Sequence, residues 1–248
     1  MNTLKTWDKI NDILGETILH PQYFVVKPQK KILKIVLSKV KGKVLDIGCG
    51  RQLLKQPIIN LNRGCAYIGL DHPGIYKRQR ATSLPDILAD VTQIPLPDSS
   101  CDSAILLMVL EHLPNPAKGL SEIYRVLHPN GLMFISTVEN YPAHDLPDDH
   151  FRFRNSGLRA ICKDNGFKII KSYSFGNFWE INCVNFNVFL MQSAKLFLDK
   201  TRNIPATIIF VLLIYPLIFT SNLLTLVMRP FDFVNQSRLI NFVIAQKK

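Results

Sequence analysis

A short apolar run that ends in a glycine turn, "KVLDIGCG" (43–50), opens a regular alternation of strand-like and helix-like segments. The run contains β-branched residues, is too short for a helix and stops at glycine, which predicts a buried strand. Strands that alternate with helices predict an α/β fold with a parallel sheet covered on both faces. Further strands are expected at 66–71, 86–90, 103–109, 131–138, 167–175 and 238–248, and helices at 115–127 and 156–167.

The composition divides the chain of 248 residues into four segments. Residues 1–42 are expected to form a basic helical segment, and residues 43–177 carry the alternation of strands and helices. Residues 178–235 are far more apolar and predict a hydrophobic helical insertion. Residues 236–248 alternate polar and apolar positions again, which predicts that the last strand of the core follows the insertion.

The charge and the cysteines indicate which partners and which cellular compartment to expect. A net charge of +11 favours anionic partners, namely nucleic acid, an anionic membrane surface or a phosphorylated substrate, and does not choose among them. The five cysteines include no C-x-x-C pair, which indicates free thiols in a reducing compartment and no metal site. The first residues lack the apolar core of a signal peptide, so a cytoplasmic location is expected.

The glycine turn predicts a ligand without phosphate. Gly48 and Gly50 allow a tight turn and a close approach of the backbone to a ligand. A dinucleotide site would have a third glycine at the position of Leu53, and a carboxylate such as that of Asp46 is unfavourable beside a pyrophosphate. A carboxylate there suits an ammonium group, as in S-adenosylmethionine.

Two further acids follow strands and fit that ligand. Asp71 ends the second expected strand, where an acid can accept hydrogen bonds from both ribose hydroxyls. Asp90 ends the third, where a carboxylate can accept from an adenine amino group while the N–H of Val91 reaches a ring nitrogen. The alternative for each acid, Asp46 included, is a cap of the following turn or helix.

Three stretches, "VLDIGCG", "YIGLD" and the run from "ADVTQIPLPDSSCD" through "LEHLPNP" to "RVLHPNG", resemble the class I S-adenosylmethionine-dependent methyltransferases of the small-molecule branch. The resemblance covers residues 40–175. It implies a Rossmann-like, seven-stranded, mostly parallel sheet with an antiparallel last strand and helices on both faces. The residues expected to bind the cofactor are Asp46, Gly48, Cys49, Gly50, Asp71, His72, Asp90, Val91 and Leu107.

The chain departs from the family pattern at two places. The family usually has a small residue at the position of Gln52, where a larger side chain would narrow the methionine end of the pocket or weaken binding. The pair Leu107 and Met108 stands where polar residues are common, and could pack on the cofactor. Cys49 is interpreted as a small space-filling residue and not as a nucleophile.

Methyl transfer needs few catalytic groups, because the cofactor already carries the activated methyl. A base is required only where the nucleophile arrives protonated. His150 and His144, in a loop that resembles a substrate-covering segment, are the candidate bases. The alternatives are that His112 caps or orients the following helix, that His144 is a surface loop residue, and that Arg152 is solvated. Candidate substrate contacts are Glu111, His112, Tyr141 and Arg152.

The insertion predicts membrane association. Residues 204–228 carry no charge and are long enough to cross a bilayer. Because both ends of the insertion are tied to one sheet, a single crossing is excluded, and a hairpin with 178–198 or an interfacial helix remains. The alternatives are a buried core helix and a dimer interface. Nearby cations that suit anionic lipid are Lys195, Lys200, Arg202 and Arg229.

The sequence therefore predicts an S-adenosylmethionine-dependent methyltransferase for a small-molecule, saccharide or lipid-linked acceptor at the cytoplasmic membrane face. A quinone-precursor methyltransferase and a non-catalytic scaffold with the same fold are the alternatives. A nucleic-acid substrate is not expected, because the basic residues are dispersed and no D/N-P-P-Y/F/W tetrapeptide is present. The identity of the acceptor is not encoded in any motif.

Overall fold

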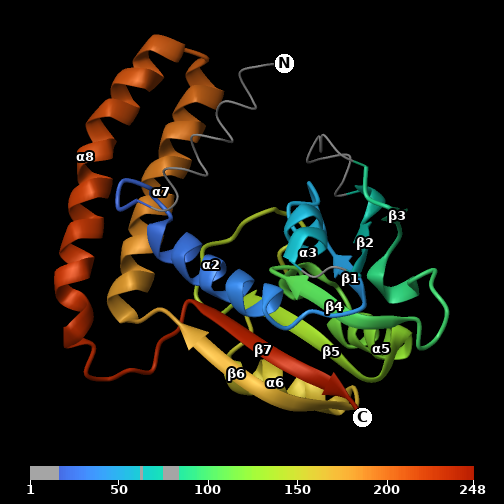
Figure 1. Cartoon of the computed structure of the whole chain (residues 1–248). Helices are drawn as coiled ribbons and strands as arrows, with labels where there is room; N and C mark the ends of the chain where they lie inside the picture. Colours follow the sequence, from blue (N-terminus) through green and yellow to red (C-terminus); the bar gives the residue numbers. More distant parts are fainter. Residues whose placement is uncertain (1–16, 62–63, 75–83) are drawn as a thin grey trace. The chain divides into compact units, whose positions relative to one another are not determined.

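The computed structural model describes residues 17–61, 64–74 and 84–248 (Figure 1). The contacts divide these residues into two units. The core unit contains residues 32–139, 143–174 and 240–248, and the second unit contains residues 140–142, 175–239 and the segment that ends at residue 31.

The core unit is built on a seven-stranded sheet with the order β3-β2-β1-β4-β5-β7-β6. β1 pairs in parallel with β2 and β4, β4 pairs in parallel with β5, and β7 runs antiparallel to β5 (Figure 1). This confirms the expected mostly parallel sheet with an antiparallel last strand. The strands are β1 (Lys43–Ile47), β2 (Ala66–Asp71), β3 (Ile87–Leu88), β4 (Cys101–Leu107), β5 (Leu127–Val138), β6 (Phe167–Phe175) and β7 (Ile240–Lys247).

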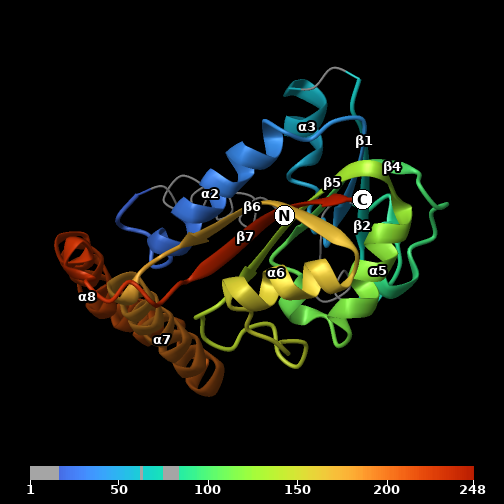
Figure 2. The ribbon, with the colours of Figure 1, turned by 90° about the horizontal axis from the view of Figure 1, so that it is seen from below.

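Helices cover both faces of this sheet. α3 (Lys55–Leu61) lies on one face, and α5 (Pro116–Val126) and α6 (Asn155–Asp164) lie on the other (Figure 2). Two short 3₁₀ turns follow strands at the edge where β1, β2 and β4 end: η1 (Val91–Gln93) and η2 (Leu110–His112). α2 (Tyr23–Leu37) falls within the segment that was expected to be helical and basic.

Local sequence signals explain the position of α5. The side chain of Asn115 accepts the N–H of Lys118 at 3.1 Å, which caps the helix, and Pro116 occupies its first position. Leu120 and Ile123 are fully buried in the core. The helix was expected to extend to 127, but β5 begins there at once because the chain pairs with β4.

The third strand is shorter than expected. The sequence predicts a strand over 86–90, but only Ile87 and Leu88 pair with β2. The Asp86 carboxylate instead accepts the N–H of Gly69 at 2.8 Å and pairs with Lys55 at 3.0 Å. Asp90 already begins the next turn, so polar side chains at both ends limit the strand.

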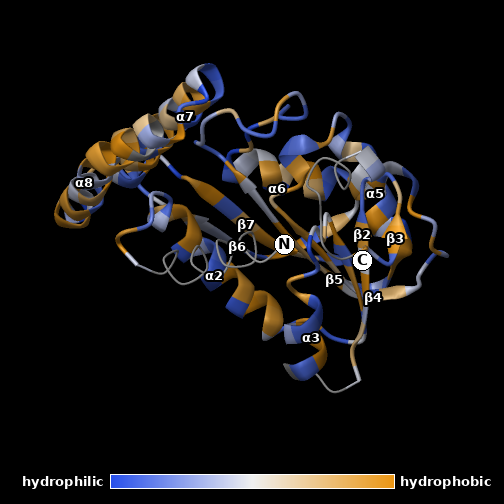
Figure 3. Ribbon diagram, turned by 90° about the horizontal axis from the view of Figure 1, so that it is seen from above, coloured by the Kyte–Doolittle hydropathy of each residue, from blue (hydrophilic) through white to orange (hydrophobic). Residues whose placement is uncertain are grey.

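The second unit contains two long helices packed as an antiparallel hairpin, α7 (Phe178–Thr201) and α8 (Ile204–Met228) (Figure 1). The helices meet through Ala194, Ile214 and Ile218, which are almost completely buried. α8 is apolar along most of its length (Figure 3).

Polar groups hold the hairpin near its middle and at its base. In the middle, the hydroxyl of Ser221 donates to Asn187 at 2.6 Å. At the base, Glu180 pairs with Arg229 at 2.8 Å, and the side chain of Asn177 donates to the carbonyl of Arg229 at 3.2 Å. The chain therefore enters and leaves the hairpin at the same end.

The stretch Ile204–Phe231 is the one helical stretch among the described residues that is long and apolar enough to cross a membrane. Only 12% of its most apolar window is buried inside the protein. A core helix of a soluble protein would be mostly buried, so α8 does not serve as a core helix for the described part of this chain.

Candidate active site

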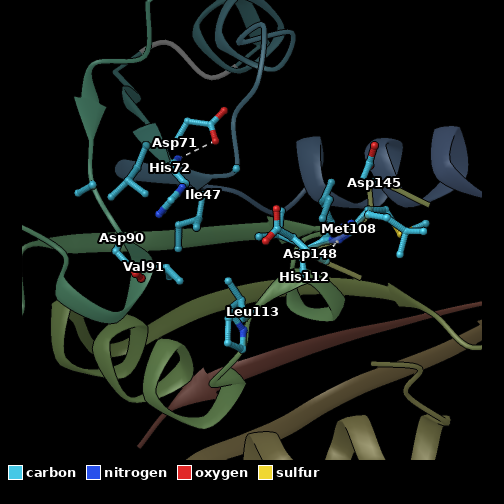
Figure 4. A pocket seen from close by; sticks show the side chains of 17 residues that line it. Ile47, Asp71, His72, Asp90, Val91, Met108, His112, Leu113, Asp145 and Asp148 are labelled. Carbon is cyan, nitrogen blue, oxygen red and sulfur yellow. Dashed lines mark hydrogen bonds between the residues drawn. The ribbon is translucent and has the colours of Figure 1, made fainter. Parts of the chain in front are cut away.

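A cavity of about 480 Å³ opens at the carboxyl ends of the parallel strands of the core unit. This is the edge of an open α/β sheet at which ligands bind, and the volume is typical of a small-molecule site. Figure 4 shows Asp71, His72 and Asp90 at one end of the cavity and His112, Asp145 and Asp148 at the other.

The glycine turn after β1 forms part of the cavity wall. Gly48 lines the cavity with a φ of +68°, and a Cβ atom there would lie 2.4 Å from Cγ2 of Val109. The N–H groups of Gly48 and Cys49 donate to the carbonyl of Leu70 at 2.8 and 3.1 Å. These bonds fix the turn against the end of β2, so only glycine fits at position 48.

Asp71 links the end of β2 to the glycine turn. Its carboxylate accepts the N–H of Gly50 at 2.9 Å and that of His72 at 2.8 Å (Figure 4). The side chain is 4% exposed and, with His72, lines the cavity. A buried carboxylate held by two backbone donors is a well-positioned acceptor for ligand hydroxyls.

Asp90 has two roles at once. Its carboxylate accepts the N–H of Thr92 at 2.8 Å and caps η1, as in the capping alternative raised from the sequence. Asp90 is nevertheless exposed to the cavity and lines it, together with Val91. Capping positions the carboxylate and leaves its second oxygen available to a ligand.

Asp46 lies within β1 and not in the turn where the sequence interpretation had put it. Its carboxylate accepts the hydroxyl of Tyr67 at 2.6 Å, and it is not among the residues that line the cavity. Burial, opposed by that hydrogen bond, raises the pKa of Asp46 to about 7. The expected contact between Asp46 and the methionine end of the cofactor stays a prediction.

Cys49 and Gly50 also lie outside the cavity lining. Burial raises the pKa of the Cys49 thiol to about 12, so the thiol is neutral at physiological pH. The sulfur fills the space beside Gly69, where a Cβ atom would lie 2.9 Å from it. This placement agrees with a space-filling residue. Gly50, with a φ of +50°, contributes its N–H to Asp71.

Gln52 adopts the left-handed conformation, with a φ of 54°. Its side-chain amide donates to the carbonyl of Leu84 at 2.8 Å, and Gln52 does not line the cavity. The side chain that departs from the family pattern is therefore directed away from the pocket. Leu107 and Met108 do line the cavity and give it an apolar wall.

His112, which lines the far end of the cavity, forms a cluster with Glu111 and His144, and these two residues are not among those that line the cavity. Each residue offers one ligand or proton-accepting atom, and the three atoms lie within 4.8 Å of one another. The imidazole rings of the histidines are 4.9 Å apart in an edge-to-face arrangement. Glu111 is completely buried, and burial raises the pKa of its carboxyl.

A second layer of hydrogen bonds orients the histidines of this cluster. Nδ1 of His112 donates to the carbonyl of Asp148 at 2.7 Å, because a carbonyl oxygen can only accept. Nδ1 of His144 lies 3.4 Å from the Asp149 carboxylate, which also accepts the N–H of His144 at 3.0 Å. The sequence analysis assigned no role to Asp148 or Asp149.

Arg152 is paired within the protein. Its guanidinium donates to the Asp149 carboxylate at 2.7 Å, and this bond holds the pKa of Asp149 at about 2. Arg152 was expected to contact the substrate, but it is not among the residues that line the cavity. Its observed contact positions Asp149, and through it His144.

His150 and Tyr141 also lie outside the cavity lining. The backbone N–H of His150 donates to the carbonyl of Glu111 at 3.0 Å, and its side chain is exposed. The hydroxyl of Tyr141 accepts the side-chain amide of Gln22 at 2.6 Å within the second unit. Of the two candidate bases, the structure brings His144 into the cluster. The catalytic and substrate roles stay predictions.

Comparisons with known proteins show which family the segment around this cavity resembles. Residues 45–135, which include the glycine turn and both acids, match the family model of a methyltransferase domain. These residues therefore form a methyltransferase domain of the class I S-adenosylmethionine-dependent type. A probable S-adenosylmethionine-dependent methyltransferase of Mycolicibacterium smegmatis is 30% identical over 135 residues, which cover 51% of this chain and 52% of that protein.

The chain is also similar to a second methyltransferase in sequence and to a solved structure in fold. A ubiquinone biosynthesis O-methyltransferase of Xanthomonas oryzae pv. oryzae is 28% identical over 119 residues, covering 43% of this chain and 47% of that protein. The crystal structure of the [4+2]-cyclase SpnF shares the fold, with a TM-score of 0.55, 16% identity and coverage of 90% of this chain and 81% of that chain. The chain spans about half the length of the curated relatives it matches.

The residues of the cavity fit S-adenosylmethionine, the cofactor of this methyltransferase family. Gly48 leaves room beside Val109 that a side chain would fill, and the wall there is backbone. Asp71 offers a buried carboxylate for ribose hydroxyls, and Asp90 offers one for an amino group. No phosphate-binding cation is among the residues that line the cavity.

Proposed function

We propose that this protein transfers a methyl group from S-adenosylmethionine to a small-molecule, saccharide or lipid-linked acceptor at the cytoplasmic face of a membrane. The observation that carries the proposal is the continuity of one cavity. It joins Asp71, at the end of β2, and Asp90, just after β3, to His112 of η2 and Asp148 of the loop after β5. One end suits the cofactor, and the other presents polar groups to an acceptor.

The cofactor, when bound, supplies a methyl group on a positively charged sulfur, and the protein supplies alignment. Gly48 allows close approach of the backbone, Asp71 accepts hydroxyl hydrogens, and Asp90 accepts from an amino group. Leu107 and Leu113 line the middle of the cavity with apolar surface. This surface excludes water from the path of the methyl.

The acceptor end contains the groups that can take a proton from a hydroxyl or an amine. His144 is held by Asp149, which is in turn held by Arg152. An imidazole can accept a proton from a hydroxyl or an amine, so His144 is a suitable general base. His150, also predicted as a base, is the second candidate, and its exposed ring would have to approach the acceptor.

Membrane association is supported by the exposed surface of the hairpin. α8 exposes large apolar side chains that no described residue covers, including Ile209 (59% exposed), Leu212 (67%), Leu213 (68%) and Leu224 (59%). The same helix is flanked by Arg202 before its start and Arg229 after its end. Apolar side chains between cations match the acyl and headgroup layers of an anionic membrane.

The hairpin favours an interfacial position over a full crossing. The exposed face of α7 mixes Phe186 and Phe189 with Asn182 and Gln192, which suits the headgroup layer. The end of α7 and the connection to α8 carry Asp199, Lys200 and Arg202, whose charges would be costly in hydrocarbon. We therefore place both helices along the membrane surface, with the apolar face of α8 toward the acyl chains.

Cofactor binding is the first test. Calorimetry with S-adenosylmethionine is expected to give a saturable isotherm that is lost in Asp71→Ala and in Gly48→Arg. Asp98→Ala, which changes a side chain that is 78% exposed on the same unit, is the matched control. A wild-type protein that does not bind the cofactor would favour the non-catalytic scaffold.

The acceptor class is tested with a labelled methyl group. Purified protein is incubated with the labelled cofactor and with separate lipid, glycan and quinone extracts. Label in the lipid or glycan fraction supports the proposal. No label in any fraction, from protein that binds the cofactor, would contradict it.

Membrane binding is tested by flotation with vesicles of neutral or anionic composition. The wild type is expected to float with anionic vesicles and less with neutral ones. Leu212→Gln with Leu213→Gln is expected to weaken flotation, and Leu53→Gln, at a residue 65% exposed in the core unit, is the control. A wild type that stays in the soluble fraction would contradict this part.

A quinone precursor is the second candidate acceptor. It is favoured by the similarity to a ubiquinone biosynthesis O-methyltransferase over 119 residues and by the apolar surface of α8. Label confined to the quinone fraction would select it over the lipid and saccharide acceptors.

A further inference from the structure

Glu111 is an unusual residue in this site. Its side chain is 0% exposed, and neither carboxylate oxygen has a hydrogen-bond partner among the described residues. Buried polar groups are nearly always bonded, and a buried carboxylate without a partner is costly. A group that the protein binds at this point would remove the cost.

Two histidines lie next to this carboxylate. Glu111, His112 and His144 each offer one possible ligand atom, and these three atoms lie within 4.8 Å of one another. Glu111 and His112 come from η2, after β4, and His144 comes from the loop that closes over the same end of the cavity. Two imidazoles and one carboxylate are a ligand set that binds first-row divalent metal ions.

The surroundings of the histidines match those of metal ligands. A metal-bound histidine normally donates its other ring N–H to a carbonyl or a carboxylate. Nδ1 of His112 donates to the carbonyl of Asp148 at 2.7 Å, which leaves Nε2 as the nitrogen with a lone pair. Nδ1 of His144 lies 3.4 Å from the carboxylate of Asp149, which Arg152 fixes.

We propose that Glu111, His112 and His144 bind a divalent first-row transition-metal ion at the acceptor end of the cavity. The set favours zinc, iron(II) or manganese(II) over magnesium or calcium, which prefer oxygen ligands alone. Bonds of about 2.1 Å place tetrahedral ligands roughly 3.4 Å apart. The side chains therefore close inward on binding.

The metal gives the acceptor end a chemical preference. Three protein ligands leave at least one position open, and an oxygen of the acceptor can occupy it. A bound cation lowers the pKa of a coordinated hydroxyl. With His144 held as a metal ligand, this effect takes the place of the general base that His144 supplies in the absence of a metal. The inference rests on the proposed methyltransferase function and narrows its acceptor to a molecule with a metal-binding hydroxyl or carboxylate oxygen.

The ligands are far apart in the sequence, so no metal-binding spacing is visible there. Glu111 and His112 are adjacent, but His144 follows only after β5. The sequence accordingly predicts no metal site. The cluster depends on the fold of the loop, in which the N–H groups of His150 and Phe151 both donate to the carbonyl of Glu111 at 3.0 and 3.1 Å.

The test uses the full chain after dialysis against a chelator. Titration with zinc chloride in a calorimeter is expected to show one equivalent bound, with affinity reduced at least about tenfold in Glu111→Gln and in His144→Gln. Cobalt(II) is expected to give a visible absorption band in the wild type only. His128→Gln, at a histidine of β5 outside the cluster, is the control and keeps the wild-type affinity.

Binding of S-adenosylmethionine to the same samples shows that the variants are folded and separates the two proposals. Intact cofactor binding with equal zinc affinity in the wild type and in Glu111→Gln overturns the metal site and leaves the methyltransferase proposal standing. The methyltransferase proposal is overturned if zinc binds the wild type more tightly than Glu111→Gln and His144→Gln but the wild type does not bind S-adenosylmethionine. Methyl transfer that stops on chelation and returns with zinc supports both.

Discussion

The carboxylate of Asp71 accepts the backbone N–H of Gly50 at 2.9 Å, so the last residue of β2 holds the glycine turn that follows β1. The turn is fixed from both sides, since the N–H of Gly48 also donates to the carbonyl of Leu70 at 2.8 Å. The same carboxylate that faces the cavity thus shapes the wall beside it. Binding and local stability are coupled through one side chain.

Asp71→Asn is expected to weaken both cofactor binding and the stability of the core unit. The amide keeps the size of the side chain but removes the negative charge, and hydrogen bonds to charged groups contribute about 1.5–3 kcal/mol. We expect cofactor affinity to fall by roughly 10- to 100-fold, with a lower melting temperature. Calorimetry and thermal denaturation measure the two effects. An unchanged affinity would remove Asp71 from the cofactor site.

Gly48→Ala is expected to destabilise the core unit by about 1–3 kcal/mol, because it adds a Cβ at a φ of +68° and against Val109. Cofactor binding should fall as well. Gly157→Ala is the control, since a Cβ at this position in α6 meets nothing within 4 Å. Urea denaturation compares the three proteins. Equal stability of wild type and Gly48→Ala would contradict the geometry of the turn.

Gln52→Gly tests whether the departure from the family pattern affects the pocket. The Gln52 side chain bonds to the carbonyl of Leu84 and does not line the cavity. Glycine also tolerates the left-handed conformation. We expect cofactor affinity to change by less than about threefold, or under about 1 kcal/mol. A tenfold gain would mean that Gln52 restricts the methionine end.

Asp46 should make stability depend on pH. Its folded pKa is raised to about 7, whereas an unfolded aspartate titrates near 3.9. The folded state therefore binds the proton more tightly, so this contribution is present in full below the unfolded pKa and is lost as pH rises through about 7. Asp46→Asn should flatten this dependence. The urea midpoint of unfolding is measured at several pH values for both proteins. An equal change of the midpoint with pH in the wild type and in Asp46→Asn would refute the prediction.

Local patterns were sufficient for most of the strands and helices and for residues such as Asp71 and Asp90 that line one end of the cavity. The run at 204–228 predicts α8 because it is uninterrupted by charge, and Asn203 caps its first turn at Ala206. The glycine turn and Asp71 were identified because strand ends in a parallel sheet meet at one edge. These features depend on neighbours in the sequence or on the sheet alone.

The acceptor end could not be derived from such patterns. His144 reaches the cluster only through the course of the loop after β5, and the pairing of Asp149 with Arg152 depends on the same loop. The burial of Asp46 was missed for a different reason. An acid at the end of an apolar run can face the ligand or the interior, and here the hydroxyl of Tyr67 selects the interior.

The N–H of Leu239 donates to the carbonyl of Phe175 at 2.8 Å, so the chain closes on itself where β6 ends and β7 is about to begin. α7 and α8 lie between these two residues in the sequence. In evolutionary terms, one insertion or deletion event at that point can add or remove the hairpin without reordering the sheet.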